Sequence, residues 1–351
     1  MCIANLVRAV MKKLRSQSQS RRTFLRRGAI AVAAAGSVTA EVLFASEGNQ
    51  KLSDRQPGYD YTEIIAGNQY GYRVFGSATP RHHAFFFHGM PVSRLDACIL
   101  HQAAAHHDVQ IISVDRPGIG LSCYQPDRTV LSTAKDFHEL ANVLGIADCY
   151  SIIGHSFGCI SASACGKLIS SAGGLKKVAL VAPFAPNWMT GVNSRAGQFL
   201  RRVATDGAFG RNIFRLIRSG THSRMPTSRM LVRMAAVNLL PAADREYADS
   251  ELTVQSMGQC STQGPHGPLR ELQLGLCDWD FKLQQIKEGH RFKIWQGALD
   301  DFTPTDVACF FAHGNDCDAG ITDSDICISD CDGHYSILGT VGNEIIQSIL
   351  P

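Results

Sequence analysis

The sequence predicts an α/β fold, in which a mostly parallel eight-stranded sheet is flanked by helices and carries an inserted helical cap. Three observations support this prediction. Short, unbroken apolar runs alternate with helix-length segments, a pattern typical of parallel strands buried on both faces. Glycine-rich motifs follow several of these runs. Between Pro183 and about Pro265, by contrast, the chain shows only helical stretches with scattered arginines.

The strands follow one another along the body of the chain. Tyr61–Ile65 and Tyr70–Phe75 are expected to form an antiparallel pair. Six further strands are expected at residues 84–87, 109–114, 150–153, 177–181, 292–295 and 325–328. In sheets of this kind, function gathers at the loops that follow the carboxyl ends of the strands.

This order of elements divides the chain into parts. Residues 60–185 and 270–351 are expected to form the α/β core, and residues 41–59 a polar linker. Residues 186–269 are expected to form a helical cap over the carboxyl edge of the sheet. The alternative is a helical face that packs away from the functional site.

The first 40 residues have the features of an export signal. They contain eight lysines and arginines and no acidic residue, and Ser20-Arg21-Arg22-Thr23-Phe24-Leu25-Arg26 matches the twin-arginine pattern. The alanine-rich segment Gly28–Thr39 that follows is too short to span a bilayer stably. We therefore expect a bacterial protein that the twin-arginine machinery exports to the periplasm or secretes. The alternative is a basic tail followed by an ordinary helix.

The rest of the chain has the composition of a mildly acidic globular protein. Without the first 40 residues it holds 26 lysines and arginines against 31 acidic residues, which gives no support for nucleic-acid binding. No other segment is long and apolar enough to cross a membrane. Four of the twelve cysteines are expected to be small buried apolar residues: Cys149, Cys159, Cys165 and Cys327.

The most informative motif is Gly154-His155-Ser156-Phe157-Gly158, which lies between an apolar strand and a helix of small residues. A serine at such a junction sits on a tight turn, and the flanking glycines keep Cβ atoms out of the space where strand and helix meet. The turn exposes the hydroxyl, and the following helix favours the negative charge that develops in acyl transfer. Ser156 is therefore the predicted nucleophile.

Other strand ends supply the partners that a serine nucleophile needs. The loop Phe87-His88-Gly89-Met90-Pro91 can direct the Met90 N–H at a developing oxyanion, beside the N–H of Phe157. Asp300 follows the seventh strand and His334 the eighth. An imidazole takes the proton from the serine, and a carboxylate holds its tautomer and stabilises its positive charge.

With the motifs H-G-x-P (88–91), D-R-P-G-x-G (115–120) and G-H-S-x-G (154–158), the chain resembles the α/β-hydrolase superfamily from roughly Tyr61 to Leu350. The order Ser156, Asp300, His334 is that of the superfamily's triad. The resemblance implies Ser156 as nucleophile, His334 as base and Asp300 as acid, with Asp301 as a rival for the acid. It also implies oxyanion donors at Met90 and Phe157.

The resemblance implies a serine enzyme that acts on a small-molecule carboxylic ester, or a similar acyl substrate, through an acyl-enzyme. No metal or organic cofactor is predicted, although Cys327, Cys331 and His334 resemble part of a metal site. Dehalogenases and epoxide hydrolases of this fold carry Asp at the nucleophile position and are disfavoured. Two alternatives remain: perhydrolysis or C–C bond hydrolysis by the same triad, and a non-catalytic protein that binds a ligand.

Overall fold

The computed structural model describes residues 52, 55–184, 195–223, 229–234, 240, 242–276, 279–313 and 325–351. The expected export signal, residues 1–40, lies outside these ranges. Eight strands form one sheet in the order β1-β2-β4-β3-β5-β6-β7-β8. They are β1 (Asp60–Ile65), β2 (Asn68–Gly76), β3 (His82–Phe87), β4 (Val109–Val114), β5 (Tyr150–His155), β6 (Leu175–Val181), β7 (Phe292–Gly297) and β8 (Ile326–Ser329).

The sheet is mostly parallel, as predicted. β1 pairs with β2, and β2 with β4, in antiparallel fashion, whereas the pairs from β4 and β3 across to β8 are all parallel. Parallel neighbours bring their carboxyl ends to one edge of the sheet. The loops after β3, β4, β5, β7 and β8 therefore meet there, and these are the loops that carry the predicted site.

Alternate residues of the central strands enter two hydrophobic cores, because successive side chains of a strand point to opposite faces. Phe85 and Phe87 lie in one core with side chains of α4 (Val130–Val143), α5 (Gly158–Leu168) and α12 (Thr305–His313). Ala84 and Phe86 lie in the other with those of α3 (His101–His106) and α14 (Gly342–Ser348). Both faces are covered, which explains the unbroken apolar runs of the sequence.

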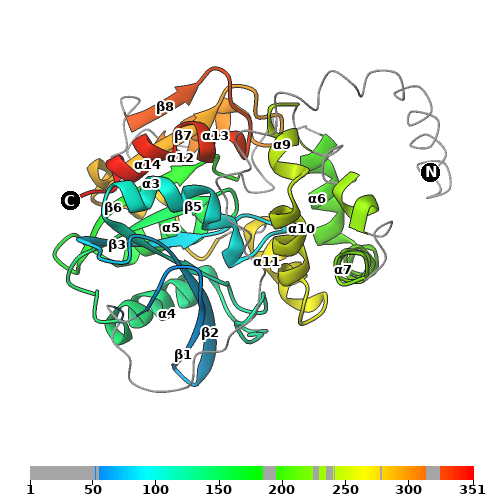
Figure 1. The fold of residues 1–351 in the computed structure, drawn as a ribbon, viewed down its shortest axis with the longest axis horizontal. Coiled ribbons are helices and arrows are strands. Elements are labelled where there is room, and N and C mark those ends of the chain that lie inside the picture. The colour runs from blue at the N-terminus through cyan, green and yellow to red at the C-terminus, as the bar shows by residue number, and fades with distance from the viewer. Residues whose placement is uncertain are drawn as a thin grey trace. The chain divides into compact units, whose positions relative to one another are not determined.

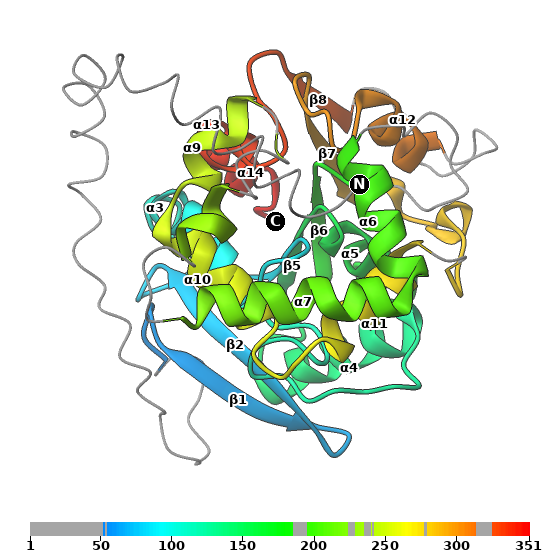
Figure 2. The ribbon, with the colours of Figure 1, turned by 90° about the vertical axis from the view of Figure 1, so that its right-hand side faces the viewer.

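A helical insertion separates β6 from β7 (Figure 1). Its described helices are α6 (Arg195–Thr205), α7 (Gly207–Thr221), η3 (Ala242–Asp244), α9 (Arg245–Ala248), α10 (Glu251–Cys260) and α11 (His266–Leu276). Figure 2 shows α7 lying across this group in front of α10 and α11. The short helices η4 (Leu283–Gln285) and η5 (Gly289–Arg291) lead into β7, and α13 (Ser336–Thr340) precedes α14.

The insertion contacts the loops at the carboxyl edge of the sheet. Ser256 of α10 accepts a hydrogen bond from the Ser93 N–H after β3, at 2.9 Å. The carbonyl of Gln259 accepts one from the Gly120 N–H after β4, at 3.1 Å. In α11, a Cβ at Gly275 would lie 2.4 Å from the ring of Phe157. The insertion therefore lies over the edge to which the predicted site belongs.

Two of the cysteine predictions were wrong. Cys159 and Cys165 on α5 are fully buried, but Cys149 is exposed and Cys327 only half-buried. Cys149 precedes β5 on a turn, and β8 is the edge strand of the sheet, so neither position is covered on both sides. Among the described residues, no helix combines the length and apolar character that a membrane span requires.

Candidate active site

Ser156 lies on the turn between β5 and α5 with a backbone φ of +55°. This left-handed conformation is uncommon for a residue with a Cβ and costs about 1–3 kcal/mol. Two backbone hydrogen bonds offset the cost: Ser156 N–H donates to the carbonyl of Val181 (2.9 Å), and its carbonyl accepts from Phe184 N–H (3.3 Å). The fold therefore holds the serine in a strained position at the carboxyl edge of the sheet.

The glycines on either side of Ser156 are required by the packing. A Cβ at Gly158 would lie 1.9 Å from the carbonyl oxygen of Phe87 at the end of β3. A Cβ at Gly154 would lie 2.8 Å from the carbonyl oxygen of Gly158. Strand β3, strand β5 and helix α5 thus approach so closely that only hydrogen fits, as the sequence predicted.

His334 and Asp300 form a buried pair. Nδ1 of His334 lies 2.8 Å from Oδ2 of Asp300. The same carboxylate accepts hydrogen bonds from the Thr303 hydroxyl at 2.6 Å and from the Gln296 side chain at 3.1 Å. Asp301, the rival candidate for the acid, is exposed to solvent. The structure therefore brings Asp300, rather than its neighbour, against the imidazole.

The charges of this pair are mutually stabilised. Burial alone would lower the pKa of His334, but the Asp300 carboxylate and its hydrogen bond outweigh burial and raise that pKa above 6.5. Burial would raise the pKa of Asp300, but the charge of His334 and the hydrogen bonds from His334 and Thr303 bring it below 3.8. Asp300 thus stays ionised, accepts from Nδ1–H and leaves the other ring nitrogen, Nε2, as the basic atom.

Ser156 and His334 are linked through His155, and their side chains form no hydrogen bond with each other. Nε2 of His155, the residue before the serine, lies 3.0 Å from the carbonyl oxygen of His334, and the two imidazole rings are 5.1 Å apart. Neither Ser156 Oγ nor His334 Nε2 hydrogen-bonds to any described residue. Catalytic hydrogen bonds are often loose without substrate and tighten in the substrate complex.

The predicted oxyanion loop lies directly against the serine. A Cβ on Gly89 would lie 3.1 Å from Cβ and 3.6 Å from Oγ of Ser156. Met90 N–H, one residue further, and Phe157 N–H, one residue after the serine, have no partner among the described residues. Two backbone donors near Ser156 thus have no partner in the described part of the chain, one from the loop after β3 and one from the residue that follows the serine.

The side chain of Arg116 fixes the backbone of this loop by hydrogen bonds. Its fully buried guanidinium donates hydrogen bonds to the carbonyl oxygens of His88 and Gly89, the latter at 3.1 Å. It also forms an ion pair at 2.7 Å with Glu271 of α11, which pairs in turn with Arg128. The backbone that precedes Met90 is thus fixed by a cation that is itself neutralised by the insertion.

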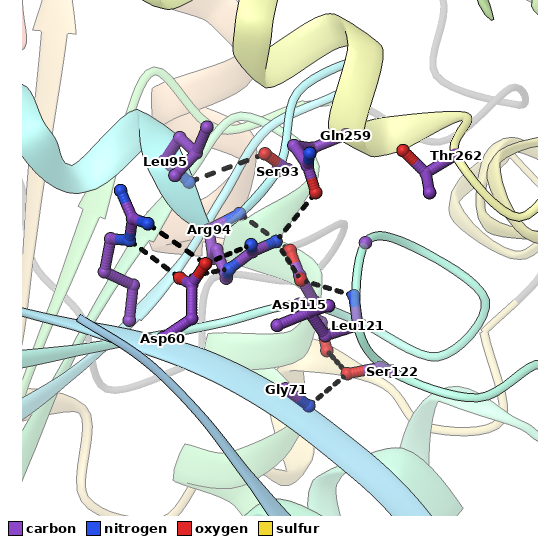
Figure 3. Close-up of polar contacts among 12 residues, drawn as sticks. Asp60, Gly71, Ser93, Arg94, Leu95, Asp115, Leu121, Ser122, Gln259 and Thr262 are labelled. Carbon is purple, nitrogen blue, oxygen red and sulfur yellow. Dashed lines mark hydrogen bonds and ion pairs between the residues drawn. The ribbon is translucent and has the colours of Figure 1, made fainter. Parts of the chain in front are cut away.

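Arg94 joins the same loop to three other segments (Figure 3). Its guanidinium donates to both carboxylate oxygens of Asp60, each at 2.8 Å, and to Oδ2 of Asp115, also at 2.8 Å. The backbone N–H of Arg94 donates to the other oxygen of Asp115 (2.8 Å). The side-chain oxygen of Gln259 in α10 accepts a hydrogen bond from the guanidinium at 3.3 Å. Arg94 is 2% exposed. Strand β1, the loops after β3 and β4, and the insertion are thereby linked through one side chain.

Several of these residues had no predicted role in the site. Thr303 lies three residues after Asp300, a spacing typical of a side chain that bonds back to a turn, and this signal was present. Arg116 belongs to the quoted D-R-P-G-x-G motif, but the pattern does not reveal what its guanidinium contacts. Within the described ranges, no group of His, Cys, Asp or Glu residues has the arrangement of a metal site.

Comparisons with known proteins identify the family and the fold of the chain. The model of the alpha/beta hydrolase family matches residues 81–326. Among solved structures, an alpha/beta hydrolase fold protein from Nakamurella multipartita superposes with a TM-score of 0.56 at 17% identity, covering 82% of this chain and 98% of that one. A thermophilic esterase from Thermogutta terrifontis gives 0.54 at 15% identity (83% and 97% covered).

An enol-lactonase from Burkholderia xenovorans gives a TM-score of 0.58 at 14% identity, covering 82% of this chain and 99% of that one. At these identities the similarity shows the shared fold and leaves the substrate open. No curated protein matches the sequence.

Proposed function

Because the chain belongs to the alpha/beta hydrolase family, we propose that it is a serine hydrolase that cleaves a small-molecule carboxylic ester through an acyl-enzyme. The observation that carries the proposal is the buried His334–Asp300 pair, which contacts the residue before a strained serine; two backbone N–H groups near that serine have no partner among the described residues. Each part has a use in acyl transfer, and together they supply a nucleophile, a base, an orienting acid and an oxyanion hole.

The proposed reaction begins when Ser156 Oγ attacks the ester carbonyl and passes its proton to His334 Nε2. The carbonyl oxygen becomes an oxyanion, which accepts hydrogen bonds from Met90 N–H and Phe157 N–H. The imidazolium, stabilised by Asp300, then protonates the leaving alcohol as the C–O bond breaks. Water attacks the acyl-enzyme in the second half, with His334 again taking the proton, and the acid is released.

Aromatic rings near the triad favour an apolar group on the substrate. Phe302 packs 5.1 Å from the imidazole of His334. Phe157 stacks on Phe184 with ring centroids 4.1 Å apart, and Phe184 lies 6.4 Å from Phe302. An ester with an uncharged acyl part suits surroundings of this kind better than a charged one, because a charge would be desolvated there without a partner.

A fluorophosphonate probe tests the proposal on the full chain. We expect the probe to label the wild-type protein and the Ser163→Ala control, and not Ser156→Ala. Ser163 lies on α5 with a buried hydroxyl that has no partner in the described structure, so its removal is a matched loss of one oxygen. Labelling that persists in Ser156→Ala, or a wild-type protein that hydrolyses none of a series of p-nitrophenyl esters, would contradict the proposal.

We further propose that residues 1–40 direct export. The basis is the twin-arginine pattern at Arg21 and Arg22. Replacing both arginines by lysine should keep the protein in the cytoplasm of a bacterium with this export route, whereas the unchanged chain reaches the periplasm or medium. Equal export of both forms, measured by cell fractionation, would argue against this part of the proposal.

A further inference from the structure

Asp244 is a buried carboxylate of the insertion that contacts the loop of the proposed base. It ends η3 and has no exposed surface. Its Oδ2 accepts a hydrogen bond from His334 N–H at 2.7 Å. Its Oδ1 accepts two more, from Tyr335 N–H and Ser336 N–H, each at 2.9 Å. These donors lie at the start of α13, where backbone N–H groups have no partner within the helix.

The backbone on both sides of this carboxylate is packed against it. A Cβ on Gly333 would lie 2.7 Å from both carboxylate oxygens of Asp244. Three residues after Asp244, the hydroxyl of Tyr247 reaches α13 so closely that a Cβ on Gly339 would lie 1.8 Å from it. The segment from Asp244 to Tyr247 therefore forms the surface on which the loop of His334 and the first turn of α13 lie.

His334 is held at three points by three different parts of the chain. Its ring is held by Asp300 after β7, its carbonyl by His155 at the end of β5, and its N–H by Asp244. Only the last of these contacts comes from the insertion. A base must be held to within about 0.5 Å of its productive position, and a misplacement of about 1 Å can cost on the order of a hundredfold in rate.

We infer that Asp244 is a positioning residue, which sets the place of His334 and makes that place depend on the helical insertion. The inference rests on the proposed role of His334 as base. Three hydrogen bonds from consecutive backbone N–H groups to one buried carboxylate fix the direction of the backbone that carries the imidazole. A shift of the insertion would move the base with it.

Asp244 also contributes to the charge around the imidazole. Among the described residues, the titratable groups around the His334 ring are Asp300 after β7, Asp244 from the insertion, Asp96 from η2 (Arg94–Leu100), His155 from β5 and the adjacent Tyr335. Burial lowers the pKa of His334, Asp300 raises it, and Asp244 and Asp96 add to that rise. Loss of the Asp244 charge should therefore lower the pKa of the base.

The test compares Asp244→Asn with Asp249→Asn. Asp249 follows α9, is exposed and pairs at the surface with Arg233, so the control removes the same charge without touching the loop of His334. In p-nitrophenyl acetate hydrolysis by the full chain, we expect Asp244→Asn to lower kcat about 10- to 100-fold with KM changed less than twofold. The acid limb of its kcat/KM profile should move to lower pH. Asp249→Asn should change neither quantity.

Two outcomes would overturn the inference: a folded Asp244→Asn protein with kcat within twofold of wild type, or an acid limb that does not move. If Asp244→Asn fails to fold, Asp244→Glu keeps the charge and displaces it. That variant should lower kcat with the acid limb in place, and an unchanged kcat would again overturn the inference.

The proposed function can fail separately from this inference. If the wild-type protein hydrolyses no ester, ¹⁵N-histidine NMR still reports the pKa of the His334 ring. That pKa should be lower in Asp244→Asn than in the wild type and in Asp249→Asn. Equal values in all three proteins would count against the role of Asp244.

Discussion

Replacing Arg94 by methionine would test whether buried ion pairs hold the oxyanion loop in place. The substitution keeps the length of the side chain and removes its charge. Asp60 would keep Arg73, which donates to it at 2.7 and 3.0 Å. Asp115 is fully buried and has no other ion-pair partner among the described residues, so its charge would be left without a counter-charge.

The size of the effect follows from this difference. Breaking a buried ion pair by removing one partner typically costs about 3–5 kcal/mol, because it leaves a desolvated charge. The backbone N–H groups of Arg94 and Leu121 still donate to Asp115 and soften the loss. We therefore expect Arg94→Met to lower the free energy of unfolding by about 3 kcal/mol at neutral pH, at the lower end of that range.

The loss should depend on pH in a defined direction. Burial raises the pKa of Asp115 above 3.8 even with Arg94 beside it, and removal of the cation raises it further. A carboxyl whose folded pKa exceeds its unfolded pKa favours the folded state at low pH and loses that advantage as pH rises toward the folded pKa. The deficit of Arg94→Met should therefore be smaller at about pH 4, near the unfolded value, than at about pH 7.

Urea unfolding followed by tryptophan fluorescence at both pH values provides the measurement. Arg81→Met is the matched control, because Arg81 pairs with Asp108 at 3.4 Å on the surface and such exposed pairs contribute about 0–1 kcal/mol. Arg94→Met/Asp115→Asn should recover part of the lost stability. If Arg94→Met loses no more than Arg81→Met at neutral pH, the network does not stabilise the fold in the way described.

Three further predictions concern the turn that carries Ser156 and the proposed triad. Asp300→Asn should lower kcat for an ester about 10⁴-fold, because it removes the carboxylate that selects the tautomer of His334. Asp301→Asn, at the exposed neighbour, should leave kcat within twofold of wild type. Equal losses of kcat in the two variants would show that the wrong acid has been assigned. The kcat/KM of the wild type should rise with pH through an apparent pKa above 6.5, because only the neutral imidazole of His334 accepts a proton and its pKa is raised. A pH-rate profile whose acid limb has an apparent pKa below 6.5 would argue against His334 as the base. Gly158→Ala should lower the free energy of unfolding in urea by about 2–4 kcal/mol, because its Cβ would lie 1.9 Å from the carbonyl oxygen of Phe87. Gly207→Ala should lower it little, because its Cβ would meet only the flexible end of Arg211 at 3.2 Å.

The sheet could be predicted well because strand signals are local. The run Ala84–Phe87 is apolar without interruption, and in Val109–Val114 only Gln110 and Ser113 are polar; both faces of these strands are buried in the structure. The turn that carries Ser156 could be predicted equally well, because only glycine fits sterically at positions 154 and 158. The predicted burial of Cys149 and Cys327 was wrong, because burial depends on which elements pack over a residue and not on the apolar segment to which the residue belongs.

The candidate site shows the same division. Ser156, Asp300 and His334 each follow a strand, so a parallel sheet alone suffices to bring them to one edge. The sequence could not decide which carboxylate faces the imidazole, because Asp300 and Asp301 are adjacent and both follow the same strand. The turn after β7 decides between them by directing Thr303 and Phe302 N–H groups at Asp300.

By itself, then, the sequence determined which segments form strands, the position of the strained serine and the candidates for base and acid, since backbone sterics and two-residue periodicity act over a few neighbouring residues. Only the tertiary structure decided that Arg116 binds the carbonyl oxygens of the predicted oxyanion loop, that Arg94 joins four segments, and that Asp244 binds the backbone of His334 from 90 residues away. Each of these contacts joins a buried charged side chain to groups from distant parts of the chain. Packing decides which groups these are, so no local sequence pattern predicts the contact.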